Sequence, residues 1–185
     1  MKQNESIVMY VLRLAGTLLL ICAVTAGLLA GVNGITAPII AELNAAATQE
    51  AISAVLPGGF DSEITDYADA SGIVSKVYQG ENGYALEVGP GGFDNTITMM
   101  VGIDNEGKVL GISIVNHTET AGLGAVADAD TPKGIAFREQ FVGTSGSVSV
   151  TKDGGMMDAI TGATITSRAI CVGVNAALDV VAGLG

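Results

Sequence analysis

The first part of the chain is dominated by one uninterrupted apolar run. From Leu14 to Ala41 no Asp, Glu, Lys or Arg occurs, and roughly 20 apolar residues already span a bilayer as a helix. The run is longer than the apolar core of a cleaved signal peptide, which covers about 7 to 15 residues. The pattern predicts an uncleaved transmembrane helix at 14–40, preceded by a short terminus at 1–13.

After this run the pattern changes to that of an amphipathic helix. Pro38 is expected to end or kink the membrane span. Apolar residues then recur at helical spacing between Glu42 and Leu56, up to the helix-stopping Pro57-Gly58-Gly59. We expect a connecting helix in 41–59 and a separate domain in 60–185.

The middle of the chain has the residue pattern of β-strands. Runs rich in β-branched and aromatic residues are bounded by Gly and Asn, which are typical of turns. The predicted strands are 73–78, 84–88, 97–103 and 108–115. Gly80-Glu81-Asn82-Gly83 joins the first two and Asp104-Asn105-Glu106-Gly107 joins the last two as hairpin turns. The hairpins predict a small, twisted antiparallel sheet.

Helical patterns follow the sheet, so the predicted fold class is α+β. We expect a helix at 132–141, a short edge strand at 148–150 and a long apolar helix that includes 170–184. Before the sheet, 60–69 carries four carboxylates. Their spacing lacks the alternation of a calcium loop, and we expect a solvated loop there. The architecture is one transmembrane helix followed by a domain in which helices flank the sheet.

The composition is acidic, with few basic residues. The 185 residues carry a formal net charge of −11 and only 8 Lys and Arg, which excludes nucleic acid as a partner because phosphate binding needs a clustered basic patch. Lys2 and Arg13 precede the apolar run, and the next basic residue is Lys76. The positive-inside rule therefore places the amino terminus in the cytoplasm and the domain outside it. Cys22 and Cys171 lie in separate predicted helices, and no disulfide is expected between them.

Hydroxyl side chains and small residues concentrate between Asp158 and Ser167. They precede an apolar helix, whose free N–H groups favour an anion, and Gly162 and Ala163 leave the backbone open to close approach. The hydroxyls belong to Thr161, Thr164, Thr166 and Ser167. The segment is a candidate anchor for a phosphate-bearing cofactor. The alternative is an ordinary helix N-cap, for which Thr and Ser are also preferred.

A second candidate loop runs from His117 to Gly124. Its glycines allow the backbone to approach a planar ring, while the alternative is a plain loop beside the sheet. His117 is the single histidine, so it builds neither a catalytic triad nor a metal site, and we expect a local hydrogen bond for it. Gly89-Pro90-Gly91-Gly92 lacks the Lys-Ser/Thr of a phosphate-binding loop and is expected to be a connection.

The two candidate segments resemble, in the same order, the motifs of proteins that carry FMN covalently. Asp158-Ala159-Ile160-Thr161-Gly162-Ala163-Thr164 matches the acceptor pattern Asp-x-x-(Ser/Thr)-Gly-Ala-Thr. His117–Gly124 resembles His-x-Glu-Thr-Pro-Gly-Leu-Gly, with Ala121 in place of Pro. The family includes the G subunit of the Rnf/Rsx electron-transport complex and the C subunit of the sodium-translocating NADH:quinone oxidoreductase. The length of the chain favours the former.

The resemblance implies that FMN is attached through its phosphate to Thr164. In the family a separate flavin transferase that uses FAD makes this bond, and Asp158 is implied in recognition by that enzyme. The other implied cofactor-binding residues are Thr161, Gly162, Ala163, Glu119, Thr120, Gly122, Leu123 and Gly124. No residue is assigned a catalytic or metal-binding role. Lys133 or Arg138 could offset phosphate charge, the alternative being that both are solvated helix residues.

The resemblance further implies an electron-carrying subunit of a membrane-bound, ion-translocating ferredoxin:NAD oxidoreductase. Its expected partners are the other membrane and redox subunits, the flavin transferase and membrane lipid. Its expected place is the cell (inner) membrane, with the FMN-binding domain on the extracytoplasmic side. Two alternatives stay open: a membrane-anchored flavoprotein reductase outside any ion pump, and a flavin-free anchored binding domain.

Overall fold

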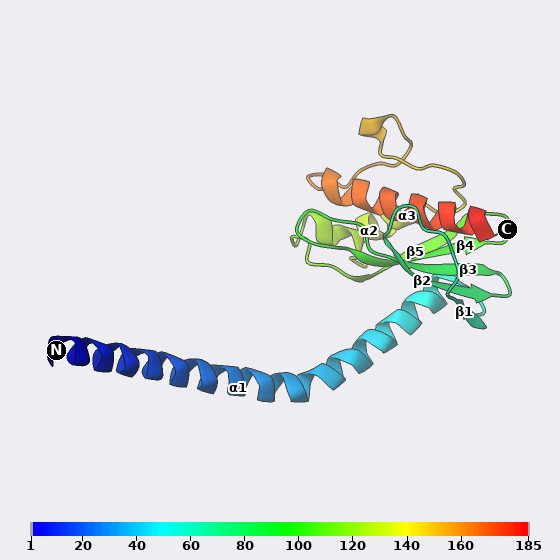
Figure 1. Cartoon of the computed structure of the whole chain (residues 1–185). Coiled ribbons are helices and arrows are strands. Elements are labelled where there is room, and N and C mark those ends of the chain that lie inside the picture. The colour runs from blue at the N-terminus through cyan, green and yellow to red at the C-terminus, as the bar shows by residue number, and fades with distance from the viewer. Residues whose placement is uncertain (1, 185) are drawn as a thin grey trace. The chain divides into compact units, whose positions relative to one another are not determined.

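The chain divides into two compact units, Met1–Ala46 and Ala47–Gly185. A computed structural model describes residues 2–184, with side chains described from Val8 to Leu184. The described part of the first unit is a stretch of helix, and the second unit holds a sheet with helices packed on it (Figure 1). The predicted α+β class is therefore confirmed, with a long apolar helix followed by an antiparallel sheet and helices.

One long helix, α1, runs from Lys2 to Val55. Its stretch from Val8 onward is long and apolar enough to cross a membrane, and every side chain from Val8 to Ala46 is exposed. Of the two outcomes predicted for Pro38, the end of the helix is wrong, because helical backbone continues on both sides of it. The helix ends at Val55, just before Pro57 as predicted.

The hydroxyl groups in the apolar part of α1 are satisfied within the helix. Thr17, Thr25 and Thr36 each donate to a carbonyl oxygen four residues earlier, at 2.8 to 3.0 Å. A polar group without a partner is costly in the hydrocarbon region of a bilayer. These side chains are therefore compatible with a membrane span.

The second unit is built on a sheet of five antiparallel strands in the order β1-β2-β3-β4-β5. The strands are β1 (Ser62–Ile64), β2 (Val74–Gly80), β3 (Gly83–Val88), β4 (Thr98–Asp104) and β5 (Val109–Asn116). Both predicted hairpins are confirmed. At the first hairpin Gly80 pairs with Gly83. Gly83 has φ +145°, and a Cβ on it would overlap the carbonyl oxygen of Ile103, so the turn requires glycine at this position.

Two short segments differ from their predicted structure. The loop predicted at 60–69 contains β1, whose three residues pair with Val77–Gln79 of β2; so short an edge strand leaves no detectable alternation in sequence. The strand predicted at 148–150 is only a bridge between Val150 and Met157. The Asn175 side chain takes the place of a partner strand at Val148. Its Oδ1 accepts from Val148 N at 2.7 Å, and its Nδ2 donates to the Val148 carbonyl at 2.9 Å.

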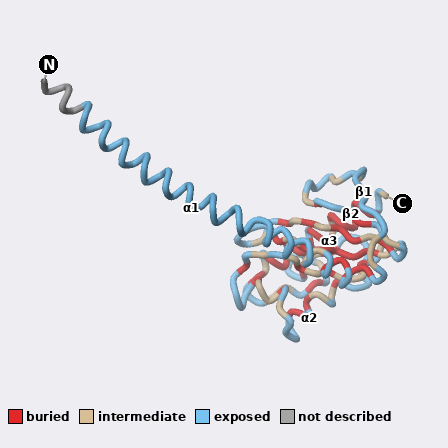
Figure 2. The backbone as a smooth tube through the Cα atoms, turned by 90° about the horizontal axis from the view of Figure 1, so that it is seen from below, coloured by how far each residue is buried: buried red, intermediate tan, exposed pale blue. Residues whose placement is uncertain are grey.

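Helices cover both faces of the sheet. On one face Met99, Val101 and Ile103 belong to the same buried core as α3 (Thr164–Leu184). On the other face the last turns of α1 place Ile52 and Val55 against β-strand residues including Met100. Buried backbone, red in Figure 2, gathers in the strands and α3. The helix α3 is also long and apolar enough to cross a membrane, but 67% of its apolar stretch is buried, as fits the core helix of this domain.

The remaining elements lie between β5 and α3. The predicted helix at 132–141 is confirmed as α2 (Pro132–Glu139), which begins after Thr131, whose hydroxyl accepts from Gly134 N at 3.3 Å. Two short 3-10 helices are η1 (Gly124–Ala127) and η2 (Thr151–Asp153). Both cysteines are free.

Because α1 packs closely on the sheet, we expect alanine to lower the free energy of unfolding at Gly102 but not at the paired Gly111. A Cβ on Gly102 would overlap the backbone of Val55, whereas one on its cross-strand partner Gly111 would lie 4.0 Å from Val55 Cγ1. Gly102→Ala should lower the free energy of unfolding by about 1–3 kcal/mol through overpacking. Gly111→Ala is the control and should change it by less than about 0.5 kcal/mol. Urea unfolding of the detergent-solubilised protein, followed by circular dichroism, measures both, and equal effects would contradict the prediction.

Candidate functional site

The predicted acceptor segment forms the turn that leads into α3. Gly162 has φ +80°, a backbone conformation that other residues rarely adopt, and a Cβ on it would come within 2.9 Å of Leu123 Cδ2. The Ala163 carbonyl accepts from Ser167 N at 3.0 Å, the first bond of the helix. The helix thus starts at Thr164, earlier than the apolar run that predicts it. Thr164 is its first residue.

The four hydroxyls of this segment have different environments. The Ser167 hydroxyl is fully buried; it donates to the Ala163 carbonyl at 2.9 Å and accepts from Ile160 N at 3.0 Å. The Thr166 hydroxyl, also buried, donates to Glu119 Oε2 at 2.6 Å. Thr161 is exposed and Thr164 is half-buried. Two hydroxyls therefore hold the turn together and two remain accessible.

A cationic side chain that sequence reasoning missed lies beside Thr164. Lys152 Nζ, from η2, donates to Thr164 Oγ1 at 3.1 Å. The next residue, Asp153, accepts two hydrogen bonds of 2.6 Å from Arg168, one turn into α3. These bonds from the guanidinium hold the pKa of Asp153 below its usual value. No spacing rule connects Lys152 with Thr164 in sequence, because two turns and a bridge intervene.

Glu119 is a buried carboxylate that joins three segments. It is 8% exposed; Oε1 accepts from Phe93 N at 2.8 Å and Asp94 N at 3.4 Å, and Oε2 accepts from the Thr166 hydroxyl. A Cβ on Gly124 would overlap the same carboxylate. The side chain therefore ties the 117–124 loop to the loop before β4 and to α3.

His117 makes the local contact predicted for it. Its Nδ1 accepts from Glu119 N at 3.1 Å, and its Nε2 lies 3.8 Å from Asp128 Oδ2. Both ring nitrogens thus face groups of the loop region itself. The predicted loop role is confirmed.

A small cavity of about 130 Å³ brings the two predicted segments together. Its walls are Phe93, Glu119, Thr120, Leu123, Gly124, Gly162, Ala163, Ile165 and Thr166. Three apolar side chains around it are well exposed: Phe93 by 67%, Leu123 by 43% and Ile165 by 48%. Exposed apolar side chains around a hollow mark a surface for an apolar or planar ligand. Phe93 and Ile165 were missed in sequence; Phe93 directly follows the Gly89–Gly92 stretch, which is a connection as predicted.

Three other predicted residues line a neighbouring hollow of about 490 Å³. Gly122, Thr161 and Asp158 face it together with Lys133. Gln140, directly after α2, holds the segment from this side: its Oε1 accepts from Asp158 N at 2.6 Å, and its Nε2 donates to the Asp158 carbonyl at 3.3 Å. The predicted site residues are thus divided between two sides of the turn.

The other basic residue predicted near a phosphate has a structural role. Arg138 Nη1 donates to the carbonyls of Ala127 and Ala129 at 2.7 and 3.2 Å, and its guanidinium also lies 3.4 Å from Asp130. Its guanidinium is therefore bonded to backbone carbonyls and is largely shielded from solvent, unlike the solvated helix residue that one alternative expected.

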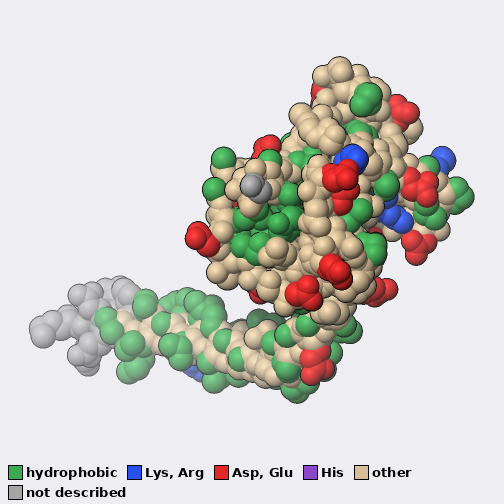
Figure 3. Space-filling model, turned by 90° about the vertical axis from the view of Figure 1, so that its right-hand side faces the viewer, with side chains coloured by type: hydrophobic (Ala, Val, Ile, Leu, Met, Phe, Trp, Pro, Cys, Tyr) green, Lys and Arg blue, Asp and Glu red, His purple; other side chains and the backbone are tan. Residues whose placement is uncertain are grey.

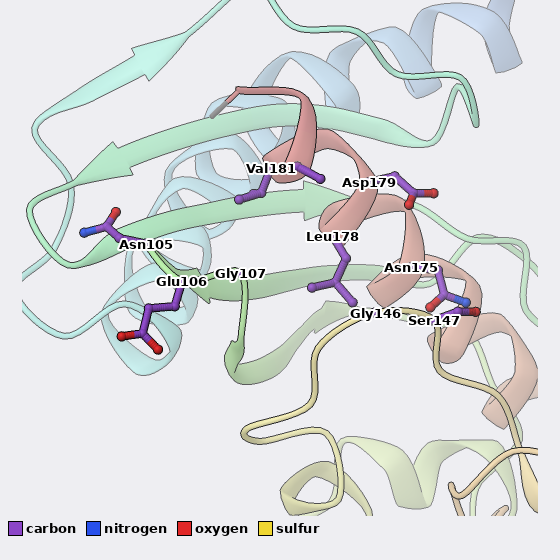
Figure 4. Close-up of a pocket in the computed structure, with 10 residues that line it drawn as sticks. Asn105, Glu106, Gly107, Gly146, Ser147, Asn175, Leu178, Asp179 and Val181 are labelled. Carbon is purple, nitrogen blue, oxygen red and sulfur yellow. The ribbon is translucent and has the colours of Figure 1, made fainter.

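A third hollow, of about 410 Å³, lies away from these segments. Leu178 and Val181 of α3 and Glu106 of the turn between β4 and β5 contribute to its lining (Figure 4). The amide of Asn175, which also lines it, is already bonded to Val148. None of the predicted site residues reaches it.

Comparisons with known proteins find two family matches along this chain. A family described as FMN-binding domain matches residues 92–179, and one described as RnfG N-terminal region matches residues 1–55. The G subunit of the Na⁺-translocating ferredoxin:NAD⁺ oxidoreductase complex of Acetobacterium woodii is 35% identical over 191 residues, which cover 92% of this chain and 91% of that protein. The chain belongs to the family of Rnf complex G subunits.

Other members of this family match over similar lengths. The G subunit of the ion-translocating oxidoreductase complex of Methanosarcina acetivorans is 34% identical, covering 89% of this chain and 91% of that protein. That of Photorhabdus laumondii is 35% identical, covering 83% and 82%. The FMN-binding match starts at Gly92, so it includes the Phe93 loop, the 117–124 loop and the acceptor segment. The N-terminal match ends at Val55, where α1 ends.

The bonds of Glu119 predict a large and coupled loss of stability in this protein. Glu119→Ala leaves the buried Thr166 hydroxyl and the part-buried Phe93 N–H without this partner, at about 1–3 kcal/mol for each group, so the free energy of unfolding should fall by about 2–6 kcal/mol. Glu139→Ala, at an exposed carboxylate of α2, should change it by less than about 0.5 kcal/mol. Denaturant unfolding of protein made without flavin transferase measures both values.

A double-mutant cycle tests the same contact. Because Thr166→Val removes the other partner of one bond, the double variant should lose less stability than the sum of the two single variants. Additive losses would show that the Glu119–Thr166 bond does not stabilise the folded state.

Proposed function

We propose that this chain carries FMN through a phosphoester to Thr164 and relays electrons within an Rnf-type complex. The observation that carries the proposal is the accessible Thr164 hydroxyl, one residue from a cavity that gathers six of the predicted cofactor-binding residues. The family match to an FMN-binding domain spans both segments. Names of relatives add the wider setting: an ion-translocating oxidoreductase complex, and for Acetobacterium woodii one that acts on ferredoxin and NAD⁺.

The residues around the cavity fit a flavin that lies partly on the surface. A pocket that encloses a ligand measures about 300–1,000 Å³, whereas this cavity measures about 130 Å³. It can therefore hold an edge of the ring system, and the exposed Phe93, Leu123 and Ile165 offer apolar surface to the remainder. Gly162, whose Cβ would press on Leu123, keeps this surface open.

Each element of the site then has a distinct task. FMN, when bound, supplies a ring that takes up and gives up electrons. Leu123 and Phe93 would offer apolar surface to this ring, and Thr120, exposed at the cavity, would offer it a hydrogen bond. Glu119 acts through the loops that it joins, because both of its oxygens are already bonded to protein groups. Gly122, Gly124, Gly162 and Ala163 allow the backbone to come close.

A covalent bond suits such an open site. A flavin that buries only part of its surface gains little binding free energy from apolar contact, and it would be lost by dilution outside the cell membrane. The ester to Thr164 removes that possibility. Asp158 and Thr161 face the neighbouring hollow. We assign Asp158 to recognition by the flavin transferase and Thr161 to the rim of the flavin site.

The membrane arrangement follows from the same proposal. Residues 1–13 form the cytoplasmic terminus, 14–40 the single span in the cell (inner) membrane, 41–59 the connecting helix and 60–185 the extracytoplasmic FMN-binding domain. Lys2 and Arg13 carry positive charge before the span, and no basic residue follows it until Lys76. By the positive-inside rule this supports a cytoplasmic amino terminus. Membrane lipid and the other redox and membrane subunits contact the span.

Replacement of the acceptor hydroxyl tests the covalent bond. Thr164→Val should abolish flavin attachment, because no oxygen remains to bear the ester. Thr96→Val, at an exposed threonine outside both motifs, is the matched control and should retain it. Both proteins are produced with the flavin transferase and compared by intact mass and by flavin fluorescence of the denatured band. Flavin bound covalently to Thr164→Val would disprove the assignment.

Cysteine labelling tests the membrane direction. Burial raises the pKa of the Cys171 thiol to about 11, so it stays protonated and reacts slowly near neutral pH. A cysteine at exposed Ser145, made as Ser145→Cys, should react with an impermeant maleimide in spheroplasts. Gln3→Cys should react only after the membrane is opened. The reverse pattern would place the domain in the cytoplasm.

A further inference from the structure

We propose that Lys152 binds the phosphoryl group at Thr164, both while the flavin is transferred and afterwards. The inference rests on the proposed function, since it presumes that Thr164 is the acceptor. The observation behind it is the 3.1 Å hydrogen bond from Lys152 Nζ to Thr164 Oγ1. The lysine lies on another element, and only the tertiary structure brings the two atoms together.

The turn that carries Lys152 is fixed on α3. Asp153 forms a two-bond pair with Arg168, and both bonds measure 2.6 Å. Such paired bonds between a guanidinium and a carboxylate fix orientation as well as distance. Thr151 N also donates to the Met157 carbonyl at 2.9 Å. The backbone of Lys152 is therefore held in place, while its exposed ammonium group can follow a ligand at Thr164.

Other basic side chains around the turn are engaged elsewhere. Arg168 is paired with Asp153, and Arg138 donates to backbone carbonyls. Lys133 lines the hollow on the Asp158 side. Acidic side chains are spread over the domain face shown in Figure 3, and basic ones are few. In the described part of the chain, Lys152 is thus the cation bonded to the Thr164 hydroxyl. Its charge matters because the protein is acidic and would otherwise repel phosphate.

The ammonium has a defined place in the transfer step. Thr164 Oγ1 attacks the phosphorus of FAD that bears the riboflavin, and the bond to the bridging oxygen breaks. AMP leaves with that electron pair, and the hydroxyl proton passes to a base supplied by the transferase. By donating to one lone pair of Oγ1, Lys152 fixes the oxygen and leaves the other lone pair free for attack. The product diester carries one negative charge, which one ammonium offsets.

The test is the rate at which purified full-length protein in detergent accepts flavin from FAD. The protein is made without transferase, and purified transferase is then added. Intact mass measures the initial rate at several concentrations of acceptor protein. The variants are Lys152→Gln, Lys152→Arg and, as a matched control on the neighbouring hollow, Lys133→Gln.

Lys152→Gln should lower kcat on the order of tenfold, because the positive charge that offsets the phosphoryl group in the transition state is lost. KM for the acceptor protein should stay within about twofold, because ground-state docking is unchanged. Lys152→Arg should restore most of the rate, and Lys133→Gln should match wild type. Unchanged melting temperatures of the flavin-free variants show that the loss is not one of folding.

Other results would overturn the inference about Lys152. A wild-type rate for Lys152→Gln would do so, as would a raised KM at unchanged kcat, which marks a docking contact with the transferase. Thr164→Val in the same series separates this inference from the proposed function. If Thr164→Val takes flavin, the acceptor assignment fails; if only Lys152→Gln behaves like wild type, the acceptor stands and the role of Lys152 fails.

Discussion

The site depends on one buried carboxylate. Glu119 receives hydrogen bonds from the backbone of the Phe93 loop with one oxygen and from Thr166 of α3 with the other. A buried charge is stable only when several donors surround it, so this side chain fixes the separation of three segments at once. The cavity lies between those segments. Its shape therefore follows from the geometry of a single hydrogen-bonded group.

The predicted acceptor turn is held by a second set of hydrogen bonds. Ser167 reaches back to Ile160 and Ala163, while Gln140 bonds both backbone groups of Asp158. These contacts fix the turn without using the hydroxyl of Thr164. The threonine is left half-buried beside an ammonium group, at the start of a helix whose first N–H groups have no partner within the helix. Its chemistry is therefore separated from the bonds that maintain the fold.

The sheet of the second unit is covered by helix on both of its faces. Its α3 face carries the core beneath the site, and its other face packs on the last turns of α1, where Gly102 allows the backbone of Val55 to approach. The same helix that ends against the sheet begins as an apolar segment with exposed side chains. Family membership and this continuity describe a membrane-anchored domain.

The sequence by itself determined most of the fold, because hydrophobic periodicity and turn residues are local. The apolar run, both hairpins, α2, α3 and the two motifs were predictable from neighbouring residues alone. Local signals failed where one distant side chain replaces a regular partner, as Asn175 does at Val148, and where a strand is as short as β1. Only the tertiary structure decided which hydroxyls are buried, that Glu119 joins three segments, that Phe93 lines a cavity with Ala163 and Ile165, and that Lys152 is bonded to Thr164. Those relations depend on contacts between residues far apart in the chain, and no spacing in the sequence encodes them.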